Sequence, residues 1–145
     1  DYNVRCYYRD GKWSAPQLET SEELTLHMAA TCLHYGQEAF EGLKAFRGKD
    51  GRVRIFRMRD NAERLQSSCR GIMMAELPVE LFEEMVLLVV KKNERFVPPY
   101  ESGASLYIRT GGGKTVEGVH LSDLRHPGRS LFQGGVQANT HGDHA

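Results

Sequence analysis

Tyr107 and Arg109 are a pair of residues whose types and spacing could do chemistry. They alternate within the run Ser-Leu-Tyr-Ile-Arg at residues 105–109, and residues two apart in a strand point to the same face. A phenol hydroxyl beside a planar guanidinium can hold a carboxylate. An ordinary edge strand carries the same pattern more often, so the pair alone indicates a candidate carboxylate site and no more.

Arg64 is a candidate anion-binding residue. We expect a helix over residues 61–70, with Asp60 as its N-cap and Glu63 completing a capping box. Arg64 would then lie one turn inside a helix start, where free amide groups favour an anion and a guanidinium can grip a phosphate with two hydrogen bonds. The alternative is an exposed arginine paired with Asp60 at i, i+4 spacing, and the residues alone favour that alternative.

Two further patterns do not predict a site. Residues 111–115 read Gly-Gly-Gly-Lys-Thr, but a phosphate loop needs a glycine where Ile108 stands. The histidines of residues 111–145 have no periodic segment around them to fix a metal geometry, so we expect a solvated tail. The three cysteines are widely spaced, which favours reduced thiols and gives no metal-ligand spacing.

Composition sets the class of protein. A chain of 145 residues that is 40% hydrophobic can close one core. Its 19 basic residues equal its 19 acidic residues, so charge gives no reason to expect a nucleic-acid partner or an anionic membrane. The longest apolar run, residues 85–90, is far too short to span a bilayer. We therefore expect a soluble, cytoplasmic chain.

The elements that must position these residues follow from the pattern of the first 110 residues. Asp10-Gly11 predicts a hairpin turn after a strand at residues 3–9, and a Gly/Asp turn joins expected strands at 39–47 and 52–57. Gly71 should end the first helix, and Pro78 should begin a second helix that carries the main apolar face. Residues 105–109 predict a short strand.

The remaining segments are less regular. Residues 15–23 predict a surface connection, and the periodicity of residues 24–35 does not separate strand from helix. The implied fold class is α+β, with a mostly antiparallel sheet packed against two helices. We predict one domain over residues 1–110 and a loop-like or disordered tail over residues 111–145, which is rich in glycine and histidine.

From Tyr2 to Arg109 the chain resembles the N-terminal domain of the branched-chain amino acid aminotransferases, which is the small lobe of the fold-type IV aminotransferases. The motifs that carry the resemblance are residues 34–36 (His-Tyr-Gly), 40–46 (Phe-Glu-Gly-Leu-Lys-Ala-Phe), 55–57 (Ile-Phe-Arg), 61–65 (Asn-Ala-Glu-Arg-Leu) and 105–109 (Ser-Leu-Tyr-Ile-Arg). Their order and spacing are those of the family.

The resemblance implies a class IV enzyme that uses pyridoxal 5′-phosphate. Such an enzyme moves the amino group of leucine, isoleucine or valine to 2-oxoglutarate, giving a branched 2-oxo acid and glutamate. By the resemblance, Arg64 binds the cofactor phosphate, while Tyr35 and Phe40 line the side-chain pocket, Tyr35 from the other subunit of a homodimer.

The resemblance also assigns roles within the strands. It implies that Tyr107 and Arg109 hold the substrate, including the distal carboxylate of glutamate. Gly42 would keep its strand thin where the ligand approaches the backbone. All of these are expectations for the intact enzyme.

The chain departs from the family after Arg109. Thr110 stands where the family has proline, and the tail resembles nothing in the family. None of the lysines, which are Lys12, Lys44, Lys49, Lys91, Lys92 and Lys114, lies in the context of the lysine that forms the Schiff base. The resemblance therefore implies no catalytic residue here, and we expect the chain to be inactive alone.

Two alternatives remain open at this point. The chain could be the lobe of a D-amino acid aminotransferase or an aminodeoxychorismate lyase, although its Phe-Glu-Gly-Leu-Lys-Ala-Phe run is closer to the branched-chain group. It could also be a non-enzymatic fragment that only dimerises. Turnover of L-leucine against D-alanine would separate the first alternative from the branched-chain interpretation.

Overall fold

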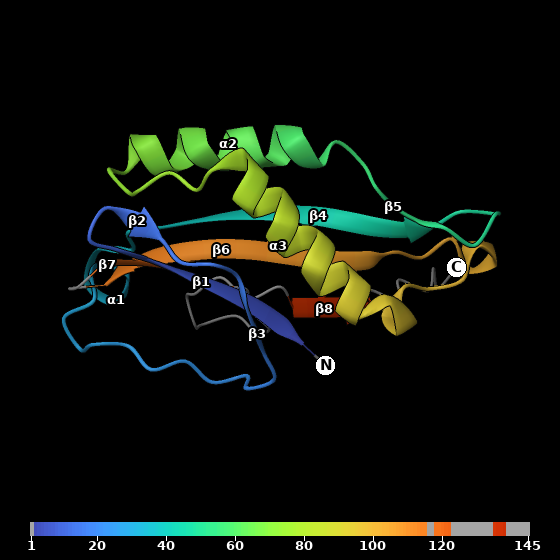
Figure 1. Cartoon of the computed structure of the whole chain (residues 1–145), viewed down its shortest axis with the longest axis horizontal. Helices are drawn as coiled ribbons and strands as arrows, with labels where there is room; N and C mark the ends of the chain where they lie inside the picture. The colour runs from blue at the N-terminus through green and yellow to red at the C-terminus, as the bar shows by residue number, and fades with distance from the viewer. Residues whose placement is uncertain (1, 116–117, 123–134, 139–145) are drawn as a thin grey trace, which may run out of the picture.

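The computed structural model describes residues 2–115, 118–122 and 135–138 (Figure 1). Side chains are described up to residue 113. The strands are β1 (Asn3–Arg9), β2 (Lys12–Trp13), β3 (Gln17–Glu19), β4 (Glu38–Arg47), β5 (Val53–Ile55), β6 (Leu106–Thr115), β7 (Gly118–Ser122) and β8 (Gly135–Ala138). The helices are α1 (Thr31–Tyr35), α2 (Met58–Gly71) and α3 (Val79–Lys92), with 3-10 turns η1 (Glu94–Phe96) and η2 (Tyr100–Ser102).

The strands form one sheet in the order β2-β1-β7-β6-β4-β5, with β3 paired to β1 and β8 paired to β6. Every strand pair is antiparallel. Strand β6 lies between β4 on one edge and β7 and β8 on the other. Helices α2 and α3 lie on one side of this sheet, and α3 crosses its strands diagonally (Figure 1). The predicted α+β class, an antiparallel sheet against two helices, is confirmed.

The two predicted hairpins are confirmed. Asp10 and Gly11 have φ angles of 50° and 76° between β1 and β2, as a tight two-residue turn requires. Strands β4 and β5 pair from Ala45 to Arg47 across the loop that contains Gly51. The 15–23 connection differs from the prediction because it contains β3, which pairs with β1. The undecided segment 24–35 ends in the short helix α1.

The predicted start of α2 is wrong. The helix begins at Met58, its N-cap is Arg57 with a left-handed φ of 50°, and no side chain caps it. Asp60 therefore lies inside the first turn, where it forms an ion pair with Arg57. The Asp60 carboxylate is therefore paired with Arg57 and does not cap the helix. The expected end is close, because Gly71 is the last residue of α2.

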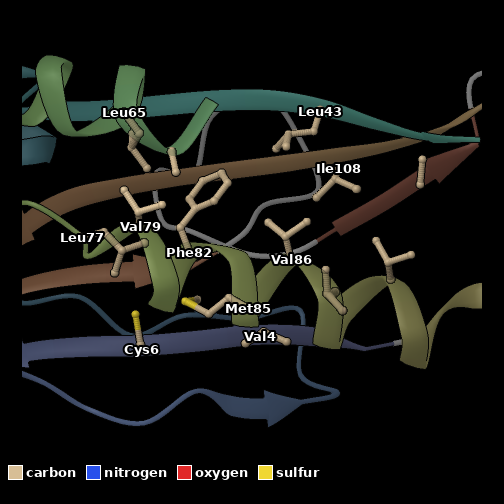
Figure 2. Close-up of a cluster of buried hydrophobic side chains, with 14 of the residues drawn as sticks. Val4, Cys6, Leu43, Leu65, Leu77, Val79, Phe82, Met85, Val86 and Ile108 are labelled. Carbon is tan, nitrogen blue, oxygen red and sulfur yellow. The ribbon is translucent and has the colours of Figure 1, made fainter. Parts of the chain in front are cut away.

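Helix α3 follows its prediction, since Pro78 is the N-cap and the helix runs to Lys92. Its buried face packs against both α2 and the strands, as Figure 2 shows. Phe82 and Val86 of α3 meet Leu65 of α2, Leu43 of β4 and Ile108 of β6 in one cluster, and each is at most 3% exposed. Burial of these apolar side chains is the main force that holds the helices on the sheet.

The segment after Thr110 differs from the predicted loop. Strand β6 continues from Leu106 through Gly111 to Thr115, and β7 and β8 add further pairs to it. The sequence of this segment has no apolar periodicity, but backbone hydrogen bonds on both edges of β6 hold it in the sheet. His120 lies in β7, whereas the other histidines of the tail lie outside the described residues. The domain boundary near residue 110 stays a prediction.

The three cysteines are buried, and none of them forms a disulfide. Burial raises the pKa of the Cys6 thiol to about 12 and that of Cys69 to about 11, so both are protonated near neutral pH.

Within the part of the chain that the structure describes, no helix is long and apolar enough to cross a bilayer.

Candidate functional site

Strands β4 and β6 divide their side chains between two faces of the sheet. Ala39, Leu43 and Ala45 of β4, with Leu106 and Ile108 of β6, are at most 7% exposed and face the helices; we call this the covered face. The opposite, open face carries the alternate residues Phe40, Gly42, Lys44 and Phe46 of β4 and Tyr107 and Arg109 of β6. The register sets Gly42 opposite Arg109 and Lys44 opposite Tyr107. Four of the predicted site residues therefore lie together.

Gly42 makes room for the ring of Tyr107. A Cβ atom built on Gly42 would lie 3.0 Å from Cε2 and from Cζ of Tyr107, which is closer than real Cβ atoms normally approach. The predicted reason for glycine was the approach of a ligand to the backbone. In the structure the group that uses the space is the Tyr107 side chain, whose ring and hydroxyl lie over Gly42.

Arg109 lies over the ring of Phe40, with its guanidinium carbon 5.6 Å from the ring centroid. Phe40 is 64% exposed, so this contact is a cation–π interaction at the surface. Among the described residues Arg109 has no carboxylate within ion-pair distance. Its guanidinium can therefore still accept an anionic ligand beside an aromatic ring.

Tyr35 is the predicted substrate-binding residue that the cluster on the open face does not include. It is the last residue of α1, is 83% exposed, and precedes Gly36, which takes the left-handed conformation at the C-cap. Its ring lies beside His34, with the centroids 6.3 Å apart. The chain leads from Gly36 directly into β4, so Tyr35 lies near the beginning of the strand that carries Phe40.

Arg64 lies on α2, where neither of its two predicted neighbours is found, while its predicted role in phosphate binding stays a prediction. Because α2 begins at Met58, Arg64 is in the second turn rather than beside the free amides of a helix start. Asp60 does not pair with it, since that carboxylate binds Arg57. Arg64 instead donates from Nε to Oε1 and from Nη2 to Oε2 of Glu41, both at 2.6 Å. This pair raises the pKa of Arg64.

Glu41 is the site residue that the sequence analysis missed. It occupies a position on the covered face of β4, its side chain is 6% exposed, and Asn61 also donates to its Oε2 at 2.9 Å. A signal was present, because a glutamate interrupts the alternating apolar positions Ala39, Leu43 and Ala45. A charge at such a position needs a partner, which Arg64 provides.

The two candidate groups lie on opposite faces of the same strand. Glu41 and Arg64 are on the side of α2, whereas Gly42 and its neighbours lie on the open face. Along one edge of β4, strand β5 pairs only with Ala45 to Arg47. The part of this edge before Ala45 has no partner in β5. There Asn61 reaches the carbonyl of Gly42 at 3.4 Å.

The side chains of this arrangement are of types that suit ligand binding. An arginine and a phenol hydroxyl suit a carboxylate, an exposed ring suits an aliphatic side chain, and Arg64 suits a phosphate. The structure brings together Phe40, Gly42, Tyr107 and Arg109 on the open face. Arg64 lies on the other side of β4, where it binds Glu41.

Comparison with known proteins gives the relatives of the chain. It is 46% identical over 144 residues to the branched-chain-amino-acid aminotransferase of Haemophilus influenzae, a match that covers 94% of this chain and 42% of that protein. A crystal structure of the Escherichia coli branched-chain amino acid aminotransferase superposes with a TM-score of 0.59 at 20% identity, covering 83% of this chain and 38% of that one.

A second solved structure has the same fold. A branched-chain amino acid aminotransferase complexed with N-(5′-phosphopyridoxyl)-L-glutamate, from the organism abbreviated T.th., gives a TM-score of 0.58 at 23% identity, over 83% of this chain and 39% of that one. No protein-family model matches the chain. The chain is thus homologous to branched-chain amino acid aminotransferases and spans about 40% of their length, consistent with their N-terminal part.

Proposed function

We propose that this homologue of the branched-chain amino acid aminotransferases forms the substrate-side N-terminal lobe of such an enzyme. In that role it would help transfer the amino group of leucine, isoleucine or valine to 2-oxoglutarate. The observation that carries the proposal is the meeting of Phe40, Gly42, Tyr107 and Arg109 on the open face. They came from two motifs far apart in the sequence, and the register of β4 and β6 makes them neighbours.

Three residues of the open face would bind the substrate. Arg109 and Tyr107 would hold a carboxylate, and the exposed ring of Phe40 would contact an aliphatic side chain. An apolar wall discriminates weakly among such side chains, since one methylene is worth about 1–3 kcal/mol. We therefore expect leucine, isoleucine and valine to be accepted alike.

The proposed cofactor is pyridoxal 5′-phosphate, which supplies the electron sink for amino-group transfer when it is bound. The residues present fit its phosphate end. The side chain of Arg64 is 65% exposed, and Glu41 uses only two of its five N–H donors, so three remain for phosphate oxygens. Two solved relatives carry a phosphopyridoxyl or pyridoxamine phosphate group, which supports the proposal.

We propose that the chain alone does not catalyse the transfer. Lys44 is exposed on the open face, and Lys91 and Lys92 end α3 on the helix side, but neither place matches the motif of the reactive lysine. The intact enzyme would be a cytoplasmic homodimer in which Tyr35 reaches the pocket of the other subunit. Exposure of Phe40 and Phe46 in the single chain supports a missing cover over this face.

A transaminase assay with leucine and 2-oxoglutarate tests the proposal. The chain alone should give no turnover, whereas residues 1–110 joined in place of the matching part of the Haemophilus influenzae relative should give turnover with L-leucine. In that chimera Arg109→Gln should lower kcat/KM about 10- to 100-fold, because it removes charged hydrogen bonds to substrate. Arg52→Gln, at an arginine 82% exposed in the β4–β5 loop, is the matched control.

Three results would contradict the proposal. They are robust turnover by the chain alone, activity of the chimera with D-alanine in place of L-leucine, and equal effects of Arg109→Gln and Arg52→Gln.

A further inference from the structure

Glu41 is an acidic side chain placed where the fold would normally put an apolar one. It lies on the covered face of β4, two residues from both Ala39 and Leu43, and is 5% exposed as a whole residue. Taking a carboxylate out of water costs several kcal/mol unless its oxygens are paired. Such a position must therefore be stabilised by specific donors.

Three donors satisfy the Glu41 carboxylate. Arg64 Nε donates to Oε1 at 2.6 Å, and Arg64 Nη2 and Asn61 Nδ2 donate to Oε2 at 2.6 Å and 2.9 Å. Both arginine bonds come from one edge of the guanidinium, so the planar group can take only one orientation while they last. Asn61 comes from the same helix, one turn before Arg64, and donates to the same carboxylate oxygen as Arg64 Nη2.

The other edge of the Arg64 guanidinium points away from this pair. Both N–H groups of Nη1 and the second N–H of Nη2 are not used by Glu41, and the side chain is 65% exposed. These remaining donors can hold an oxyanion with two parallel hydrogen bonds. A flexible arginine would lose rotamer freedom on binding, whereas this one is already ordered.

We propose that Glu41 is a positioning residue for Arg64: it binds one edge of the guanidinium so that the other edge presents a preformed grip for a phosphate ester. The inference rests on the proposed function, in which Arg64 binds the cofactor phosphate. Glu41 itself touches no ligand and acts through Arg64.

Anion binding distinguishes two roles of Glu41: orienting Arg64, or only forming an ion pair that joins α2 to β4. Removing the negative charge of Glu41 should strengthen anion binding at Arg64 if charge alone matters, because like charge beside the site repels an anion. If Glu41 acts by orienting Arg64, the same change should weaken anion binding. The sign of the effect therefore decides.

The experiment measures binding of pyridoxine 5′-phosphate and of pyridoxine to the full chain and its variants by NMR titration. Neither probe has an aldehyde, so neither reacts with lysine. We expect the unaltered chain to prefer the phosphate ester and Arg64→Gln to abolish that preference. We expect Glu41→Gln to weaken binding of the phosphate ester about three- to tenfold and to leave pyridoxine binding unchanged.

Two controls keep the measurement specific. Glu63→Gln removes a negative charge from the same helix without touching Arg64, since Glu63 pairs with Arg59, and should leave phosphate binding equal or tighter. The Nε–H resonance of Arg64 should exchange slowly with water in the unaltered chain and rapidly in Glu41→Gln. Should that variant not fold, Glu41→Asp keeps the charge but shortens the side chain, and we expect the same weakening.

The outcomes separate the two proposals. Equal or tighter phosphate binding in a folded Glu41→Gln chain, or in Glu41→Asp if only that variant folds, would overturn the role of Glu41 while leaving the proposed role of Arg64 intact. No preference for the phosphate ester in the unaltered chain, or an unchanged preference in Arg64→Gln, would overturn the proposed role of Arg64 and the inference with it.

Discussion

The covered and open faces of β4 and β6 belong to the same two strands but differ in what they carry. The covered face has small or aliphatic side chains such as Ala45 and Ile108, both fully buried, while the open face has large rings such as Phe40, which is 64% exposed. Helices α2 and α3 cover only the first of these faces (Figure 1). Large rings next to a guanidinium on an exposed face are typical of a binding surface rather than a core.

Hydrophobicity alone therefore does not locate the core of this chain. Phe82 and Phe40 are the same residue type, but one is 2% exposed between helix and sheet and the other lies beside Arg109. The alternation along the strand, combined with the helices above it, decides which ring stabilises the fold. The predictions below test that division.

The largest expected effect is on the covered face. Phe82→Ala should lower the free energy of unfolding by about 3–5 kcal/mol, because it leaves a cavity where α3 meets the sheet. Phe40→Ala, its counterpart on the open face, should change it by about 1 kcal/mol or less, since only a surface cation–π contact is lost. Urea unfolding followed by circular dichroism measures both, and equal losses would break the distinction between the faces.

An intermediate effect is expected at Gly42. Gly42→Ala should cost about 1–3 kcal/mol of unfolding free energy, because the new methyl group overlaps the Tyr107 ring and must displace it. Gly71→Ala is the matched control: nothing lies within 4 Å of a Cβ there, and alanine at this helical position should stabilise by about 0.5–1 kcal/mol. Unchanged stability and an unchanged Tyr107 ring resonance in Gly42→Ala would contradict the packing described for the open face.

The smallest expected effect concerns a charge pair away from both faces, in the β4–β5 loop. Asp50 accepts hydrogen bonds from the Arg54 side chain and from the Arg52 backbone, and these lower its pKa from 3.8 to about 2. A lowered pKa means that its stabilising contribution is present above pH 3.8 and is lost as the pH falls toward 2. Because both groups are exposed, the contribution should be small.

NMR titration of the Asp50 carboxyl checks this. Its midpoint should lie near pH 2 and should rise toward 3.8 in Arg54→Gln, with little change in unfolding at neutral pH. A midpoint that does not move in Arg54→Gln would show that the pair does not form.

Much of the fold could be predicted from local chemistry. The Asp10-Gly11 turn, the β4–β5 hairpin and the proline start of α3 each depend on a few neighbouring residues, and all three were predicted correctly. The start of α2 was predicted wrongly. The Asp60 carboxylate could either cap the helix or form an ion pair with Arg57, and it pairs with Arg57. Pairing of residues 111–115 with β4 and β7 depends on distant strands, which local periodicity cannot reveal.

The site was predictable to the extent that strand alternation applies. Tyr107 and Arg109 on one face followed directly from their spacing, and their meeting with Phe40 and Gly42 required the register of β4 against β6. The partner of Arg64 could not be predicted from spacing, because Glu41 lies 23 residues away on another element. Roles in ligand binding stay predictions for all of these residues.

Titration of the full chain with 2-oxoglutarate, followed by NMR, tests whether the open face binds substrate. If the open face is the substrate wall, the ring resonances of Phe40 and Tyr107 and the Nε–H resonance of Arg109 should shift together. Those of Phe82 and Leu65 on the covered side should not move. Absence of shifts at the open face with 2-oxoglutarate at millimolar concentration, or shifts centred on Phe82 and Leu65, would contradict the account.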